Sequence, residues 1–225
     1  RWFLKSLQSR HETLLKVAGV SKKLGETQVL KNVDLEVKNL VRPGMSQGQV
    51  VALLGPSGVG KTTLFRILAG LDLPDEGKVT LQHDEPVRRG TVGVVAQHYP
   101  LFNHRTVLGN LVTAGQQVKL SKSEATDKAK NLLQRFGVAE QSGKYPVQLS
   151  GGQRQRVAIA QQFMCSNDLL LMDEPFSGLD LMALERVSDF IMEMAAQDEL
   201  RTLVIVTHDI HAAVAVADTI WLLGR

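Results

Sequence analysis

The 225-residue sequence predicts an α/β fold with a mainly parallel sheet, an N-terminal antiparallel β subdomain and an inserted α-helical subdomain. Short, continuously apolar runs are typical of parallel strands buried on both faces, and three such runs end at Leu54, Met172 and Thr207. Two segments near the N-terminus flank Gly25-Glu26, which indicates a β-hairpin. Over residues 99–161 the pattern becomes helical, which favours a subdomain inserted between two α/β stretches.

The elements are expected in a clear order along the chain. The hairpin strands cover residues 14–20 and 29–37, and Lys38–Gln49 reads as a loop because it holds two glycines and a proline. A helix over Thr62–Ala69 precedes Gly70, a typical C-terminal glycine. Ser121 and Glu124 form a capping-box pattern for a later helix. The remaining expected elements are strands at Val50–Leu54, Val92–Val95, Leu169–Met172, Leu203–Thr207 and Ile220–Leu223, and a helix at Leu181–Ala195.

Composition limits the class of protein. Hydrophobic residues make up 44% of the chain and charged residues 22%, which is ordinary for a globular protein with a sizeable core. No apolar run approaches the roughly 18–20 residues needed to cross a bilayer, so the chain is not expected to span a membrane by itself. The net charge of +3 comes without a basic block, which counts against nucleic acid as a partner.

A glycine-containing loop follows the first apolar run and has the P-loop spacing G-x-x-x-x-G-K-[ST]. Glycines at 55, 58 and 60 let the backbone curl around phosphate oxygens without a clash of a Cβ atom. Lys61 is expected to reach the β- and γ-phosphates, and the Thr62 hydroxyl to hold Mg²⁺. We interpret this segment as a nucleotide-binding loop made of Gly55, Pro56, Ser57, Gly58, Val59, Gly60, Lys61, Thr62 and Thr63.

Two carboxylates follow the second apolar run. Asp173 stands at the predicted strand end, where it can hold hydrated Mg²⁺. Glu174 is placed to orient or deprotonate an attacking water. The carboxyl ends of parallel strands meet at one edge of a sheet, where ligands bind. The P-loop, these two carboxylates and His208, which follows the third run, are therefore expected to converge there.

A second glycine-containing turn, Leu149-Ser150-Gly151-Gly152-Gln153, precedes a predicted helix with Ser150 in the cap position. A helix start of this kind can bind an anion. The nucleotide of this chain already occupies the P-loop helix, so the second turn needs a phosphate of its own. A second copy of the protein supplies one most simply.

From about Leu15 to Arg225 the chain resembles the ATP-binding subunits of ABC transporters, whose core is a P-loop NTPase fold, with the motifs in that family's order. Gly55–Thr62 resembles its Walker A loop, Leu169–Glu174 its Walker B strand, and Leu149–Gln153 its LSGGQ signature. Ser177–Asp180 resembles its D-loop, Gln97 its Q-loop residue and His208 its switch histidine. The resemblance implies that two subunits pair head-to-tail and close two ATP molecules between them.

The resemblance also assigns roles to individual residues. ATP-binding residues are Leu24 and 55–63 of one copy and Ser150, Gly151, Gly152 and Gln153 of the other, with Asp180 in the D-loop. The implied catalytic set is Lys61, Gln97, Glu174 and His208, and the implied Mg²⁺ ligands are Thr62, Gln97 and Asp173. Two departures stand out: Leu24 occupies the place where an aromatic residue usually stacks on adenine, and Lys38–Gln49 is longer than the family's usual turn.

The resemblance further implies the organisation and partners of the chain. Residues 1–13 are an N-terminal extension, 14–98 and 162–225 the ATP-binding core with its β subdomain, and 99–161 the helical subdomain with the signature. Because no membrane span is expected, the chain is predicted to dock on a separate integral membrane permease at the cytoplasmic face of the cell's inner membrane. Tyr99–Thr106 and Glu174–Ser177 resemble importer subunits more than exporters.

Two other classes of protein remain as alternatives. A non-transport ABC-type ATPase would act as a conformational clamp on ribosomes or DNA, but such proteins usually carry two cassettes or long inserts, and this chain shows one cassette and no basic tract. A P-loop kinase or GTPase would need an acceptor site or a base-reading motif. Neither a kinase nor a GTPase would account for the signature turn.

Overall fold

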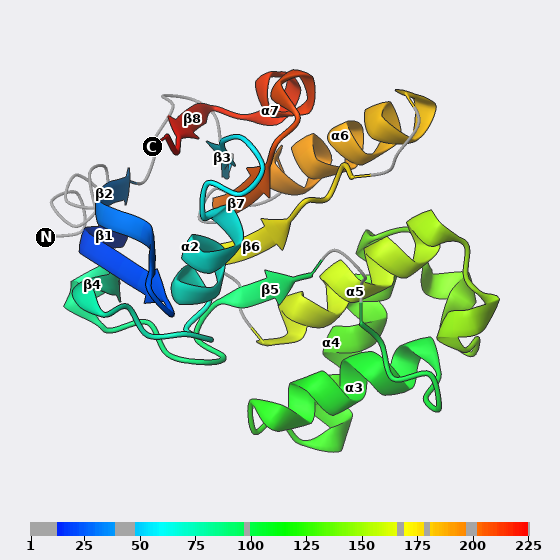
Figure 1. The fold of residues 1–225 in the computed structure, drawn as a ribbon. Helices are drawn as coiled ribbons and strands as arrows, with labels where there is room; N and C mark the ends of the chain where they lie inside the picture. The colour runs from blue at the N-terminus through cyan, green and yellow to red at the C-terminus, as the bar shows by residue number, and fades with distance from the viewer. Residues whose placement is uncertain are drawn as a thin grey trace, which may run out of the picture. The chain divides into compact units, whose positions relative to one another are not determined.

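The computed structural model describes residues 13–38, 48–96, 100–165, 169–177, 181–196 and 202–224. The chain forms two compact units, one made of Arg1–Val92 with Asp168–Arg225 and the other of Gly93–Asn167 (Figure 1). The second unit is wider than the 99–161 expected for the helical subdomain. One reason is that Gln162, beyond that boundary, accepts a hydrogen bond through Oε1 from the backbone N–H of Val94 at 3.1 Å.

The first unit holds a parallel sheet, an antiparallel sheet and the helices beside them. Its elements are β1 (Thr13–Leu24), β2 (Thr27–Lys38), β3 (Gln49–Leu54), α2 (Lys61–Leu68), β4 (Glu76–Leu81), β6 (Leu169–Asp173), α6 (Leu181–Ala196), β7 (Thr202–Thr207), α7 (Ile210–Val216) and β8 (Thr219–Leu222). The α/β class expected from the sequence is confirmed, with strands and helices in the predicted order.

The parallel sheet of this unit runs in the order β6-β7-β3-β8. Every residue of β3 and β7 is buried, as the apolar runs Val50–Leu54 and Leu203–Val206 predict for strands covered on both faces. Figure 1 shows α2 on one side of β6 and β7 and α6 on the other, and α6 packs with α7. The helices thus cover both faces and leave the strand ends for ligands.

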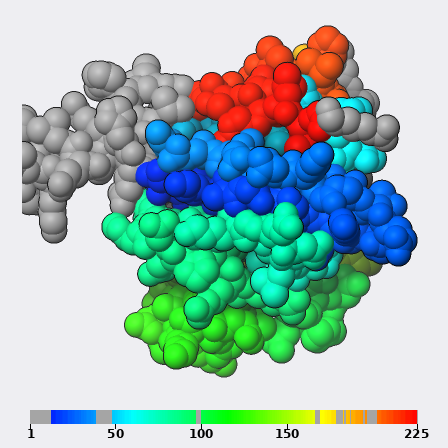
Figure 2. All heavy atoms as spheres, turned by 60° about the vertical axis from the view of Figure 1, so that its left-hand side comes forward, coloured from blue at the N-terminus to red at the C-terminus, as the bar shows by residue number. Residues whose placement is uncertain are grey.

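The antiparallel sheet has the order β2-β1-β4. Leu24 pairs with Thr27, so the hairpin turn lies at Gly25-Glu26 as predicted, and Gly25 takes the positive φ of 59° that the turn requires. Figure 2 shows β1 and β2, in blue, at the surface of the molecule. Strand β4 is not predicted from the sequence, because its lysine and threonine dilute the apolar signal of so short a strand.

The second unit consists of β5 (Gly93–Val95), α3 (Val107–Gln117), α4 (Lys122–Arg135) and α5 (Gly151–Cys165), with short 3-10 turns at Ala139–Gln141 and Pro146–Gln148. The predicted capping box begins α4: the Ser121 N–H donates to Glu124 Oε2 at 2.9 Å, and the Glu124 N–H donates to Ser121 Oγ at 3.3 Å. The buried residues of α3 and α5 are mostly apolar, and these two helices pack together within the unit.

Several expectations lie outside the described residues. They concern residues 1–12 of the extension, most of the Lys38–Gln49 loop, and Gln97, Tyr99 and Asp180. Among the residues that are described, no helix combines the length and apolar character that crossing a membrane requires. One predicted helix bound also changes: α2 begins at Lys61 rather than Thr62, so the P-loop lysine belongs to the first turn of the helix.

Candidate active site

The register of the parallel sheet brings the ends of its strands level. Leu54 of β3 pairs with Thr207 of β7, and Asp173 of β6 pairs with Val206. The next residues along the three strands are Gly55, His208 and Glu174. The P-loop, the acidic pair and the histidine therefore leave the sheet at one edge, as the order of motifs led us to expect.

The P-loop turns through two glycines with positive φ, 79° at Gly58 and 104° at Gly60. L side chains rarely adopt such angles, whereas glycine does so at little cost. Gly60 is the N-cap of α2, and within the described residues no side chain caps this helix and no acid lies in its first turn. The N–H groups at the start of α2 are therefore left for an anion.

The loop is packed tightly between neighbouring segments. A Cβ atom on Gly60 would lie 2.9 Å from Leu30 Cδ2 and 3.0 Å from the carbonyl oxygen of Val29. On Gly55 it would lie 2.6 Å from the carbonyl oxygen of Leu223. Close approach of the Leu223 backbone thus requires glycine at position 55, and at position 60 both the close approach of Val29 and the φ of 104° require it.

Lys61 is folded back over the loop that precedes it. Its side chain is 7% exposed, and Nζ donates to the carbonyl oxygens of Gly55 at 2.7 Å and Pro56 at 3.0 Å. An ammonium group held by two backbone carbonyls can exchange these neutral acceptors for phosphate oxygens, with which it forms stronger hydrogen bonds.

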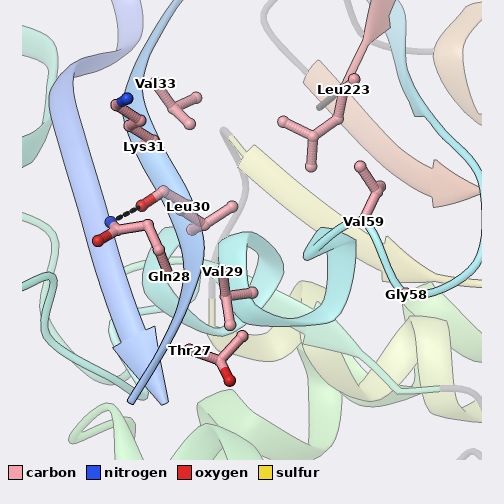
Figure 3. Close-up of a pocket in the computed structure, with 10 residues that line it drawn as sticks. Thr27, Gln28, Val29, Leu30, Lys31, Val33, Gly58, Val59 and Leu223 are labelled. Carbon is pink, nitrogen blue, oxygen red and sulfur yellow. Dashed lines mark hydrogen bonds between the residues drawn. The ribbon is translucent and has the colours of Figure 1, made fainter. Parts of the chain in front are cut away.

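A pocket of about 560 Å³ adjoins the loop at Gly58 and Val59 (Figure 3). Val59 and Leu223 extend into it from one side, and β2 forms the other wall through Thr27–Leu30, Lys31 and Val33. The Gln28 amide is engaged with the carbonyl oxygen of Leu30. Leu24, predicted to contact the base, is 55% exposed at the end of β1 and is not among the residues that line this pocket.

Asp173 and Glu174 place two carboxylates side by side at the end of β6. Burial raises the pKa of Asp173 above its ordinary value, and the negative charge of Glu174 raises it further, while Lys61 acts in the opposite direction. A hard divalent cation prefers carboxylate oxygens. It would relieve the repulsion that the pair carries.

Glu174 is held in one orientation by the end of β7. Its φ is +47°, an unusual value for a residue other than glycine, and its backbone is fixed by bonds to Val206 and Ser177. Glu174 Oε1 lies 2.9 Å from His208 Nδ1, and Oε2 accepts from the Thr207 hydroxyl at 3.2 Å. The two oxygens are thus engaged by adjacent residues of the neighbouring strand.

Replacing Asp173 by Asn should stabilise the nucleotide-free protein. Because the pKa of Asp173 is raised in the folded state, its ionisation destabilises the fold as pH rises above the ordinary aspartate range, and a neutral amide avoids this loss. We expect a higher melting temperature at pH 7 together with a large loss of Mg²⁺-dependent ATP hydrolysis.

Asp72→Asn is the matched control for this change. Its carboxylate pairs with Arg66 at 2.6 and 2.9 Å, and this partner lowers the pKa of Asp72. The same substitution should therefore leave the melting temperature unchanged or lower it, without loss of hydrolysis. A lower melting temperature for Asp173→Asn in thermal denaturation would contradict the electrostatic account of this site.

The signature turn lies in the second unit, at the start of α5. The Ser150 N–H donates to Gln153 Oε1 at 3.0 Å, and the Gln153 N–H donates to Ser150 Oγ at 3.3 Å. A hydroxyl that accepts this bond can still donate its own proton. A Cβ atom at Gly151 or Gly152 would meet nothing within 4 Å, and both residues are exposed. Contacts with the described residues of this chain therefore do not explain the two glycines.

Thr207 was not among the residues singled out from the sequence, although its hydroxyl contacts Glu174. The available signal was a polar residue at the end of an apolar run. Gln97 and Asp180 lie outside the described residues, so the structure does not place them.

Comparison with known proteins fits these motifs. The ABC transporter family model matches residues 39–177, which include the P-loop, the signature and the Asp173-Glu174 pair. The arginine transport ATP-binding protein ArtM of Bacillus subtilis is 39% identical over 221 residues, which cover 94% of this chain and 88% of ArtM. The sulfate/thiosulfate import ATP-binding protein CysA of Gloeobacter violaceus is 38% identical, and this chain spans 59% of its length.

Solved structures agree. Clostridium perfringens cbiO1, described as part of the ABC transporter complex cbiONQ, superposes with a TM-score of 0.81 at 29% identity, covering 94% of this chain and 85% of that one. The ADP conformation of MJ1267, an ATP-binding cassette of an ABC transporter, gives a TM-score of 0.77 at 22% identity, covering 94% of this chain and 87% of that one, and bears on the fold alone. The chain belongs to the ABC transporter family, as one of its ATP-binding cassettes.

Proposed function

We propose that this chain binds and hydrolyses ATP, works as a head-to-tail pair, and energises import of a solute through a separate membrane permease. The observation that carries the proposal is the convergence of Lys61, Asp173, Glu174 and His208 at one edge of the sheet. Anion-binding loop, carboxylate pair and histidine are the parts that hydrolysis of a nucleoside triphosphate needs.

The P-loop would bind the triphosphate. The N–H groups at the start of α2 point to a site for phosphate oxygens, and Lys61 adds a positive charge that is already desolvated. Its present bonds to the Gly55 and Pro56 carbonyls would be replaced by bonds to the β- and γ-phosphates. These bonds would concentrate the binding energy on the phosphates of the nucleotide.

The residues present fit a bound Mg²⁺. Asp173 carries a charge that burial and Glu174 disfavour, which a cation would relieve, and the exposed Thr62 follows Lys61 in the first turn of α2. Asp173 and the Thr62 hydroxyl would hold the ion, with Gln97 as a further ligand. Bound there, Mg²⁺ neutralises charge on the phosphate oxygens.

Glu174 would be the general base. Its carboxylate is fixed by Thr207 and His208, so it can accept a proton from a water held near the γ-phosphate. His208 uses Nδ1 toward Glu174, which leaves Nε2 for the γ-phosphate. In this arrangement one histidine joins the base to the phosphate that is cleaved.

The signature turn would complete the site of a second copy. Ser150 can donate its hydroxyl proton while it remains capped by Gln153, and Gly151 and Gly152 allow a phosphate to approach the backbone closely. No contact among the residues that the structure describes accounts for these glycines, which supports a role in contact with another molecule. We therefore infer two shared sites per pair, each with the P-loop of one copy and the signature of the other, and with Asp180 beside them.

The docking surface for the permease would include the loop Leu101–Thr106. Asn110 is fully buried and ties this loop down, accepting from the Phe102 N–H at 2.7 Å and donating to the carbonyl oxygens of Phe102 at 3.2 Å and Thr106 at 2.9 Å. Phe102 nevertheless remains 47% exposed. An aromatic side chain that is exposed but held in place can form part of a hydrophobic surface that binds a helix of the permease.

The relatives are named for sulfate or thiosulfate, arginine and L-cystine, so their shared architecture serves chemically different solutes. The solute would contact the permease and not this chain. The chain would act at the inner face of the cell membrane without binding nucleic acid.

Two measurements test this function. The purified chain should hydrolyse ATP with Mg²⁺, and either a chelator or Lys61→Ala should abolish turnover; undiminished turnover in the Lys61→Ala protein would contradict the role of the P-loop. When cells are fractionated by centrifugation, the chain should sediment with the membranes, and the Phe102→Asp variant should remain in the supernatant.

Leu73→Asp, at another exposed apolar residue, is the control for the second test and should leave sedimentation unchanged. Equal membrane binding by the Phe102→Asp and unmodified proteins would rule out the proposed docking surface.

A further inference from the structure

We infer that Thr207 is a positioning residue for the general base, a role that deepens the proposed function and rests on it. Thr207 ends β7 and is fully buried. Its hydroxyl lies 3.2 Å from Glu174 Oε2 and 3.1 Å from the backbone nitrogen of Asp209. The inference concerns which way the Glu174 carboxylate faces.

The hydroxyl proton of Thr207 has one direction open to it. The Asp209 N–H can only donate, so the Thr207 oxygen accepts from it. The Glu174 carboxylate can only accept when ionised, so the hydroxyl donates to Oε2. The Thr207 hydroxyl therefore accepts from the Asp209 N–H on one side and donates its proton to the Glu174 carboxylate on the other.

The rest of this network is fixed as well. Asp209 caps α7, and its Oδ1 accepts from the Ala212 N–H at 3.0 Å. The position of the Asp209 N–H is thus set by the start of the helix, and it sets the Thr207 hydroxyl in turn. A hydroxyl with no exposure to solvent does not exchange its partner for water, so this restraint on Glu174 is lasting.

The two restraints on Glu174 have different consequences. His208 is largely exposed and holds Oε1, and under the proposed function it turns toward the γ-phosphate when ATP binds. The bond to Thr207 involves no group that contacts the nucleotide. It can therefore keep Glu174 Oε2 in place while the histidine changes partners.

Removing the hydroxyl should slow hydrolysis without weakening ATP binding. In Thr207→Val the shape of the buried side chain is nearly kept, but Glu174 loses one of its two anchors. Because the bond is longer than the usual 2.5–3.0 Å for a hydroxyl donor, we expect a moderate effect, about a tenfold fall in kcat. KM for ATP should stay within about twofold, since the P-loop binds the phosphates.

Thr207→Ser keeps the hydroxyl and should restore most of kcat. Thr207→Ala removes the hydroxyl without adding a methyl group; it should show the same fall in kcat, and it replaces the valine variant if that variant does not fold. Thr202→Val is the matched control: Thr202 is a fully buried threonine at the other end of β7, where it accepts from Gln49 Nε2 at 3.1 Å. This control should lose stability but not kcat.

Combining the Thr207 and Glu174 substitutions distinguishes a positioning role of Thr207 from a general structural role. In a Glu174→Gln background, single-turnover hydrolysis should fall no further when Thr207→Val is added, since both changes remove the same function. Additive losses, a serine variant as slow as valine, or an equal fall in kcat for Thr202→Val would overturn the inference.

ATP turnover by the wild-type protein distinguishes failure of this inference from failure of the proposed function on which it rests. Wild-type protein that binds ATP without hydrolysing it contradicts the proposed function. Hydrolysis that continues at the wild-type rate in Thr207→Val contradicts only the positioning role.

Discussion

Glu174→Gln should leave ATP binding intact while turnover falls on the order of 10²–10⁴-fold, the usual contribution of a general base. An amide of the same size can still contact Thr207 and His208, so the local structure should survive, but it cannot accept a proton from water. ATP that is bound and not cleaved should then hold two copies together. Steady-state hydrolysis and light scattering with ATP measure the two effects.

Glu193→Gln provides the control, since Glu193 is an exposed acid on α6 in the same unit. It should change neither turnover nor mass in solution. A Glu174→Gln protein that hydrolyses ATP at the wild-type rate would remove Glu174 from the catalytic role. One that stays monomeric in ATP would count against the shared site.

Ser150→Arg should abolish hydrolysis although the P-loop of the same chain still binds ATP. The large side chain would fill the space in which the signature turn meets the γ-phosphate of a second copy. Arginine also cannot cap α5, which costs about 0.5–2 kcal/mol of stability. Ser150→Asp separates the two effects, because aspartate caps a helix as well as serine does but repels a phosphate. Both variants should be inactive.

Mixing two inactive proteins tests whether sites are shared. A pair made of one Ser150→Arg copy and one Lys61→Ala copy has both lesions in one site and none in the other. With free exchange of copies, a 1:1 mixture should recover about a quarter of wild-type turnover if the sites are independent. Ser123→Arg, at an exposed serine of α4, should be fully active alone. A mixture with no activity would contradict sharing.

The sequence predicts most of the architecture and the two glycine turns. Buried strands such as β3 and β7 can be predicted because a short, uninterrupted apolar run in a chain of this composition rarely forms another structure. The P-loop can be recognised in the sequence because the positive φ at Gly58 and Gly60 admits few residues other than glycine. The meeting of Gly55, Glu174 and His208 at one edge then follows from parallel strand order.

Other features depend on geometry that no local pattern encodes. The contact of Thr207 with Glu174 requires the register that sets Asp173 opposite Val206. Helix α7 was not predicted: it is only seven residues long, and its exposed Ile210 and Val214 obscure the apolar face expected of a surface helix. Helix α5 continues to Cys165, and no local pattern in the sequence marks that end.

The central claim is that one triphosphate lies between the P-loop of one copy and the signature turn of another. A crystal structure of the Glu174→Gln protein with Mg²⁺ and ATP tests it most directly. We predict that Lys61 Nζ leaves the Gly55 and Pro56 carbonyls for the phosphates, and that the second copy's Ser150 hydroxyl donates to the γ-phosphate. ATP bound to the P-loop with every signature turn facing solvent would contradict the claim.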